Sequence, residues 1–248
     1  MVALLIVAYA YTGSAPVAEA FGLIEHVDRL IGGGLLGEAR VREFRVGLFG
    51  LEGRADDARA EAARVSEIWA ELGSSTAELE GIQILAETEQ LLGDLDQAER
   101  YFRRSVEGFD ALGETGYNSS HTAGLAAVLC DQGRFDEAET WAMRSRELTA
   151  GDDFAAQAGW RMAQARVQSH RGDHTEATGL AAEAVALLEP SDYLIERAHG
   201  YEVHGMALAA AGREDEARTA LEAALELLER KGVVPAIARV RERLAALG

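Results

Sequence analysis

The sequence predicts an all-α protein, a right-handed α-solenoid of about six antiparallel helix hairpins followed by a C-terminal capping helix. Three observations predict this fold. Glycines recur at intervals of 39 or 40 residues, an alanine stands five residues after each of them, and apolar residues spaced three and four apart fill the stretches between. These positions are Gly13, Gly53, Gly93, Gly133, Gly172 and Gly212, with Ala18, Ala58, Ala98, Ala138, Ala177 and Ala217.

Each repeat is predicted to consist of two helices joined at its glycine. Glycine adopts the left-handed conformation without a Cβ clash, so it can end the first helix. Three residues later, five of the six repeats carry a side chain that can cap the second helix, and Asp96 with Glu99 and Asp136 with Glu139 would form capping boxes. The alanine then lies in the first turn of the second helix, where it allows the paired helix to approach closely. The five capping residues are Asp56, Asp96, Asp136, Thr175 and Asp215.

Unbroken repetition along the chain predicts one elongated domain over residues 1–248. The prolines agree with helices throughout, because Pro16, Pro190 and Pro235 each stand where a helix should begin or a link should run. An apolar content of 48% with only 6% aromatic residues predicts a core built from alanine, leucine and valine. The predicted repeats are approximately 1–34, 35–74, 75–114, 115–152, 153–190 and 191–232, and the capping helix is 235–247.

The pattern resembles the tetratricopeptide repeat, whose usual unit is about 34 residues. The segments GDLDQAERYFRRSVEGFDALG and GRFDEAETWAMRSRELTAG carry the resemblance, and the small residue that the family places seven positions before the glycine is present as Ala86, Ala126, Ala165 and Gly205. The large apolar residue of the family's first helix is replaced by Arg45, Gln164 and His204 in three repeats. The longer period, near 40 residues, is similar to the helical repeats of large bacterial LuxR-type and ATPase-linked regulators.

The two ends of the array differ in character. Residues 235–247 form an amphipathic segment, as expected for a helix that covers the last hairpin. Residues 1–12 are uncharged and largely apolar, so a first helix there would expose an apolar face to water. Two explanations stay open: the chain is the C-terminal part of a longer protein, which we favour, or this face forms a homo-oligomer contact through residues such as Leu5 and Val7.

Charge and hydropathy exclude several classes of partner. The 42 acidic and 24 basic residues give a net charge of −18, which opposes direct binding to nucleic acid. The apolar opening segment is too short to cross a membrane as a helix and has no basic region ahead of it, as a secretory signal would. We therefore expect a cytoplasmic protein that binds neither nucleic acid nor a membrane.

No residue pattern indicates catalysis, a metal or a cofactor. Cys130 is the single cysteine, and His170 and His174 flank a glycine corner that breaks the helical spacing a metal site needs. The glycines at 32–34 lack the Lys-Ser or Lys-Thr of a phosphate-binding loop, and no nucleophile turn is present. The sequence therefore predicts a protein that is not an enzyme.

The predicted functional surface is the concave groove lined by the first helix of each repeat. Polar side chains at its exposed positions favour selectivity by hydrogen bonding. Gln83, Glu87 and Leu91 occupy the places where family members that grip a peptide carboxylate have lysine and asparagine, so that clamp is absent. The candidate groove residues are Arg40, Glu43, Gln83, Glu87, Gln90, Arg166, Ser169, His199 and Glu202.

Two functions are compatible with these features. The first, which the resemblance favours, is a non-enzymatic scaffold for a protein or peptide partner, serving as the regulatory or sensor arm of a larger bacterial signalling or transcriptional regulator. The alternative is a sensing domain that binds a small molecule or a signalling peptide in its groove.

Overall fold

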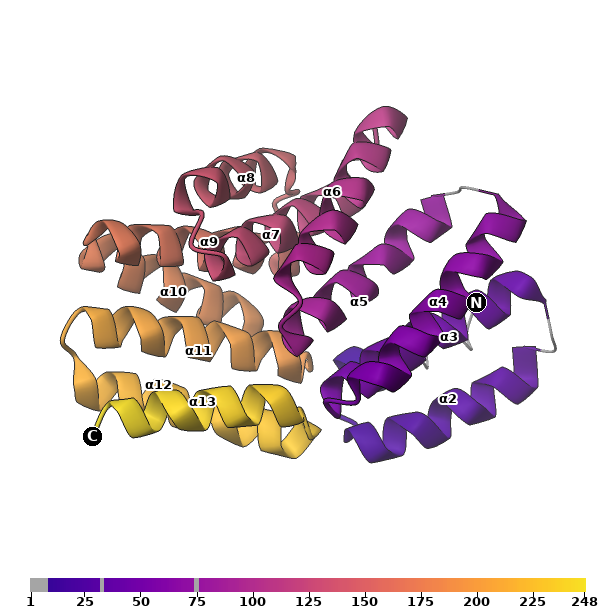
Figure 1. Ribbon diagram of the computed structural model, residues 1–248. Helices are drawn as coiled ribbons and strands as arrows, with labels where there is room; N and C mark the ends of the chain where they lie inside the picture. The colour runs from indigo at the N-terminus through magenta and orange to yellow at the C-terminus, as the bar shows by residue number, and fades with distance from the viewer. Residues whose placement is uncertain (1–8, 32–33, 74–75) are drawn as a thin grey trace.

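A computed structural model describes residues 9–31, 34–73 and 76–248, and in these ranges every regular element is a helix, which confirms the predicted all-α solenoid (Figure 1). Residues 9–12 are helical as well. The following helices are α2 (Val17–Ile31), α3 (Leu35–Leu51), α4 (Ala55–Leu72), α5 (Thr76–Leu92), α6 (Leu95–Leu112), α7 (Gly116–Asp131), α8 (Phe135–Leu148), α9 (Phe154–Arg171), α10 (His174–Leu188), α11 (Leu194–Ala210), α12 (Glu214–Lys231) and α13 (Val234–Ala246).

The helices pack as consecutive hairpins, and each hairpin leans on the next through its first helix. Helices α3, α5, α7, α9 and α11 each pack against the helix that follows in the chain. Each of them also contacts the first helix of the neighbouring repeat, and α13 covers α12. The first helices therefore form one continuous inner layer, and the second helices form the outer layer.

Five of the six predicted corner glycines end the first helices in the left-handed conformation, whereas Gly13 does not have a positive φ. Gly53, Gly93, Gly133, Gly172 and Gly212 all have positive φ, between 73° and 90°. A side chain would be strained in this conformation, so the turn depends on glycine.

The predicted capping residues are wrong by two positions. Only one residue separates each of these five corner glycines from the second helix, so the cap is that residue. The side chain of Asp94 accepts a hydrogen bond from the Gln97 N–H, and Asp173 caps α10 in the same way. Arg54, Arg134 and Arg213 hold the corresponding position in α4, α8 and α12 without a side-chain cap. The predicted aspartates lie inside the first turn, where their charge favours the helix dipole.

Small residues allow the helices to approach closely. The repeat alanines Ala98, Ala138 and Ala177 have no exposed surface. A Cβ on Gly124 would lie 2.4 Å from the Phe102 ring, so α7 packs against α6 at a distance that only glycine permits there. Alanine and glycine thus fix the spacing between neighbouring repeats.

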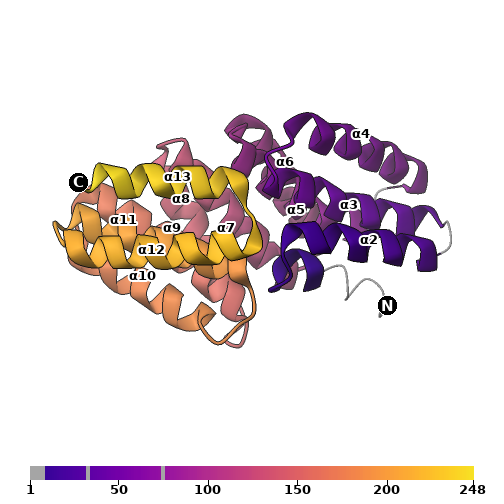
Figure 2. The ribbon, with the colours of Figure 1, turned by 90° about the horizontal axis from the view of Figure 1, so that it is seen from below.

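The first and last repeats contact each other. One apolar cluster combines Val17 and Ile24 of α2 with Leu221 and Leu228 of α12 and Val240 of α13. Both ribbon views show the start of α2 beside the α12–α13 corner (Figures 1 and 2). The solenoid therefore curves until its ends meet.

Lys231 fixes this contact between the two ends. Its side chain is completely buried, and Nζ donates hydrogen bonds of 2.8 Å to the carbonyl oxygens of Ala10, Gly13 and Ala15. An ammonium group has three N–H donors, so these three acceptors use all of them. Burial lowers the pKa of Lys231 to about 8, which still leaves the ammonium form predominant at neutral pH.

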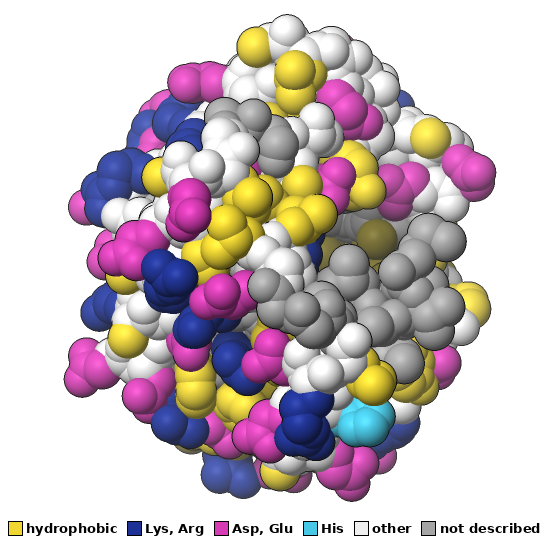
Figure 3. Space-filling view, turned by 90° about the vertical axis from the view of Figure 1, so that its right-hand side faces the viewer, with side chains coloured by type: hydrophobic (Ala, Val, Ile, Leu, Met, Phe, Trp, Pro, Cys, Tyr) yellow, Lys and Arg dark blue, Asp and Glu magenta, His cyan; other side chains and the backbone are white. Residues whose placement is uncertain are grey.

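The contact between the ends bears on the apolar N-terminal segment. Its residues 1–8, including Leu5 and Val7, lie outside the described part, but Ala10 and Tyr11 are buried in the cluster shared with the last repeat. The sequence left two explanations for what covers the apolar face of this segment, a longer chain or a homo-oligomer. For Ala10 and Tyr11, a contact within the same chain is a third. Figure 3 shows hydrophobic side chains still exposed on the N-terminal side of the molecule. Exposed large apolar residues in this half include Tyr9, Leu23, Leu30, Leu36 and Leu72.

Candidate ligand-binding site

The curved inner layer encloses a cavity of about 630 Å³. Side chains from α5, α7, α9 and α11 line it, Tyr11 contributes from the N-terminal segment, and α13 contributes from the C-terminal end. Known small-molecule pockets have volumes of about 300–1,000 Å³, so the cavity can hold a compact ligand.

Six of the nine sequence-predicted groove residues line this cavity. They come from α5, α9 and α11, three first helices that are distant in the sequence. The six are Gln83, Glu87, Gln90, Arg166, His199 and Glu202.

The other three predicted residues lie outside the cavity. Glu43 is 1% exposed and accepts hydrogen bonds from Trp69 Nε1 at 2.8 Å and from Arg40 at 3.0 Å. Arg40 also pairs with Glu80 of the next repeat, and Ser169 is half-buried elsewhere on α9. A Cβ on Gly81 would lie 2.0 Å from a Glu43 carboxylate oxygen, so this carboxylate fills a space between repeats.

One end of the cavity carries paired charges. Arg166 lies 2.5 Å from a carboxylate oxygen of Asp131, and Arg239 makes two hydrogen bonds, of 2.8 and 2.9 Å, to Glu202. Burial alone would raise the pKa of Glu202, but the hydrogen bonds and charge of Arg239 outweigh it and hold the pKa below its ordinary value. Burial also lowers the pKa of His199, which favours the neutral imidazole.

Two further carboxyl groups that line the cavity, Glu87 and Glu196, form no ion pair with a described residue. Burial raises the pKa of Glu87 to about 7, although Gln83 donates a 2.7 Å hydrogen bond to it. Burial, with a further contribution from the charge of Glu87, raises the pKa of Glu196 to about 7. Both carboxylates raise the pKa of the Tyr11 hydroxyl, which is shifted mainly by burial.

Sequence reasoning missed several lining residues. Glu196 lies one helical turn before the predicted His199 on α11, so the helical spacing could have identified it. Arg239 and Arg243 were not assigned to the groove, because the sequence does not reveal that α13 lines the cavity. Asp131 and Tyr11 were not assigned either. Both stand at the ends of helical segments, where the repeat register does not show which way a side chain faces.

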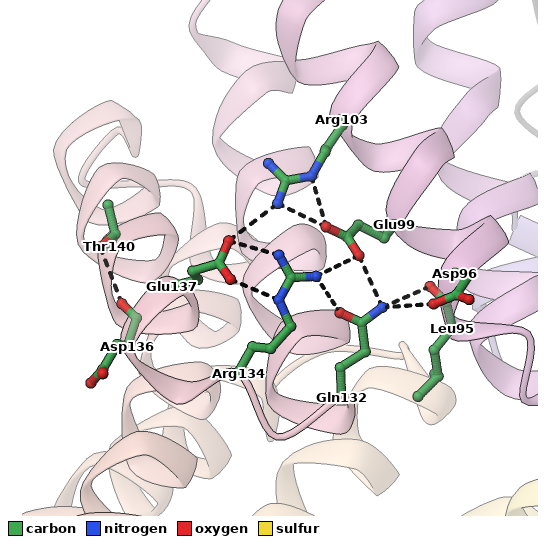
Figure 4. Close-up of polar contacts among 9 residues, drawn as sticks. All are labelled: Leu95, Asp96, Glu99, Arg103, Gln132, Arg134, Asp136, Glu137 and Thr140. Atoms are coloured by element: carbon green, nitrogen blue, oxygen red, sulfur yellow. Dashed lines mark hydrogen bonds and ion pairs between the residues drawn. The ribbon is translucent and has the colours of Figure 1, made fainter.

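A second polar cluster lies on the outer layer, where it joins two repeats (Figure 4). Glu99 of α6 accepts hydrogen bonds from Arg103 at 2.8 Å, from Arg134 at 2.7 Å and from Gln132 at 2.9 Å. Arg134 also pairs with Glu137 of α8 at 2.7 Å. Although burial acts to raise it, these hydrogen bonds lower the pKa of Glu99 to about 2. Because these contacts join α6, the α7–α8 corner and α8, the cluster stabilises the stack.

Replacing Glu99 with glutamine is expected to destabilise the protein by about 1–2 kcal/mol at pH 7. This free energy is smaller than the pKa shift alone would give, because solvent screens the partly exposed ion pairs of Glu99. Because the folded-state pKa is lowered, the contribution of Glu99 is fully present above pH 4.5 and is lost as the pH falls toward 2. Urea unfolding at pH 7 and pH 3 tests this, with Glu107→Gln on the exposed side of α6 as control. An equal loss in both variants would contradict the assignment.

The described residues hold no group of three or more histidine, cysteine, aspartate or glutamate side chains arranged for a metal ion. Within the same ranges, no helix is both long and apolar enough to cross a membrane. Burial raises the pKa of the Cys130 thiol to about 11, so the thiolate is not populated at neutral pH.

The fold and cavity define a helical-repeat scaffold with a ligand-sized internal site. Family models described as tetratricopeptide repeat match residues 120–155 and 198–223, as the motifs in the sequence predicted. These two segments of the chain therefore match the tetratricopeptide repeat. A search of curated protein sequences gives no match.

Solved structures share this fold at low sequence identity. NprR in complex with its cognate peptide NprX is 14% identical, with a TM-score of 0.71 over 99% of this chain and 70% of that one. A Rap protein complexed with Competence and Sporulation Factor is 15% identical, with a TM-score of 0.67 over 85% of this chain and 59% of that one. BtubC (BKLC) from P. vanneervenii is 16% identical, with a TM-score of 0.59 over 85% of this chain and 89% of that one. These similarities establish the fold.

Proposed function

We propose that the protein is a non-enzymatic regulatory scaffold that binds a short peptide in its central cavity. The observation that carries the proposal is the convergence of polar side chains from α5, α7, α9, α11 and α13 on one cavity of about 630 Å³. Peptide recognition by such an inner surface has a physical basis, since each repeat contributes side chains that can bond to an extended backbone. The NprR and Rap structures, solved with NprX and with Competence and Sporulation Factor, agree with this function.

The contact between the first and last repeats favours a short ligand over a whole protein partner in the cavity. A folded partner would need an open groove, whereas Lys231 and the cluster around Val17 and Leu228 connect the two ends. In this proposal a protein partner binds the outer surface, and the ligand controls how the repeats present that surface. The protein would then act as the sensor arm of a larger bacterial regulator.

Filling the cavity should abolish ligand binding. Ala127 lines the cavity from α7, so Ala127→Trp places a bulky ring there, whereas Ala60→Trp adds the same ring to an exposed position of α4. We expect a pool of random short peptides with free termini to bind the original protein and the Ala60 variant, with at least about tenfold weaker binding to the Ala127 variant. Native mass spectrometry identifies the bound peptides, and calorimetry gives their affinities.

The unfolding midpoint of both variants is measured first, so that loss of fold is separated from loss of the site. Equal affinity of a folded Ala127 variant for the selected peptides would place binding outside the cavity. If no peptide in the pool binds the original protein, the proposed function is wrong.

A further inference from the structure

Glu87 and Glu196 come from repeats far apart in the sequence and meet at one end of the cavity. Glu87 lies on α5 and Glu196 near the start of α11, and both line the cavity. The charge of Glu87 acts on Glu196, and both carboxylates act on Tyr11, so the three groups share one region of low dielectric. Each carboxyl side chain is reached only partly by solvent and is surrounded by protein.

Glu196 has hydrogen-bonding capacity that the described part of the chain does not satisfy. Its Oε2 is inaccessible to solvent, and no donor among the described residues reaches it. Glu87 receives one hydrogen bond from the neutral amide of Gln83. A buried carboxylate with so few donors is costly, so this end of the cavity is incomplete without a further donor.

Lys231 cannot supply that donor. Lys231 is the only lysine of the chain, and its charge acts on Glu196, but its three N–H groups bond to the carbonyl oxygens of Ala10, Gly13 and Ala15. Two other carboxyl groups of the cavity differ, because Asp131 has Arg166 and Glu202 has Arg239. The missing positive charge is therefore specific to the Glu87 and Glu196 end.

We propose that Glu87 and Glu196 together bind a cationic group of the ligand, a primary ammonium or a guanidinium, which approaches through the cavity and pairs with the two carboxylates. The inference rests on the proposed function and specifies its ligand class: a peptide whose amino terminus or basic side chain reaches this end. Ionised Glu87 and Glu196 would hold the cation by charge-assisted hydrogen bonds, which are stronger than neutral ones.

Two probes of nearly equal shape test the preference for a cation. Phenethylamine is positively charged at pH 7.5, and 2-phenylethanol replaces the ammonium with a neutral hydroxyl. We expect the amine to bind the original protein about tenfold more tightly than the alcohol in ligand-observed NMR titrations. Glu196→Gln and Glu87→Gln should each reduce this ratio to about twofold or less, while the affinity for the alcohol stays unchanged.

Matched variants remove the same charge elsewhere. Glu107→Gln and Glu226→Gln alter exposed positions of α6 and α12 and should retain the full preference for the amine. A preference that survives both cavity variants, or that falls equally in the two exposed controls, would show that it arises from the net charge of the protein and would overturn the site.

The outcomes separate this inference from the proposed function. If short peptides bind in the cavity by the Ala127 test but the amine and alcohol bind alike, the protein binds peptides without a cation site, and only the inference fails. If the amine is preferred and the preference depends on Glu196, the inference holds. If neither the peptide pool nor either probe binds, both fail together.

Discussion

Replacing Lys231 with methionine is expected to lower the free energy of unfolding by about 3–5 kcal/mol. Methionine keeps the apolar stem but removes the ammonium group. The carbonyl oxygens of Ala10, Gly13 and Ala15 would each lose their bond to it, and those that remain buried would lack a donor. Urea unfolding at pH 7 measures the loss.

Arg230 gives a matched control for this substitution. It precedes Lys231 on α12 but is exposed, so Arg230→Met should change stability by less than about 0.5 kcal/mol. The radius of gyration from small-angle scattering, measured under native conditions, should increase only in the Lys231 variant, because the two ends then separate. A Lys231 variant as stable and as compact as the Arg230 variant would show that the ends are not held by this ammonium group.

The Lys231 contact illustrates which part of the fold the sequence can predict. Helix pairs depend on local information: a glycine with positive φ, an alanine five residues later and apolar spacing on both sides. The contact between Lys231 and Ala10 joins residues 221 positions apart, and it depends on a small rotation per repeat summed over the whole array. No single segment of the sequence encodes the total rotation of the array, so the contact between its first and last repeats could not be predicted.

The same distinction explains the partial prediction of the cavity. Gln83, Glu87, Arg166 and His199 were found because the repeat register places them on the inner face of their own helices. Arg239 was missed because its position in the cavity depends on the closure. Glu43 was included because the register shows which face of a helix a side chain occupies. The register does not show that Trp69 and Arg40 donate hydrogen bonds to Glu43 and bury it between helices.

Glu87 and Glu196 should each make the folded protein less stable as the pH rises from 5 to 8. Both carboxyl groups have a folded-state pKa of about 7, raised from 4.5 chiefly by burial. The folded protein therefore holds protons that the unfolded chain has already released. Each group contributes stability that is fully present below pH 4.5 and is lost as the pH rises through 7, by about 2–3 kcal/mol for a shift of this size.

His199 of α11 lines the same cavity, and because burial lowers its pKa, it acts in the opposite direction within this pH window. The remaining titrating groups near the pair act outside the window. The pKa of Lys231 is lowered to about 8, so Lys231 begins to favour the folded state only as the pH approaches and exceeds 8. The pKa of Tyr11 is raised above 10, and Gln83 does not titrate. Glu202, which also lines the cavity, has a lowered pKa and stays ionised across the window.

Urea unfolding of Glu87→Gln, Glu196→Gln and the double variant at pH 5, 6, 7 and 8 tests this pH dependence. Each single variant should flatten the curve and be more stable than the original protein at pH 8, and the double variant should be flattest. General repulsion from the net charge of −18 also grows with pH, so Glu107→Gln and Glu226→Gln give the size of that effect. If all variants follow parallel curves, the two carboxyl groups are not desolvated in solution. An added cationic ligand should instead restore stability to the original protein at pH 8, because it supplies the charge that the two carboxylates lack.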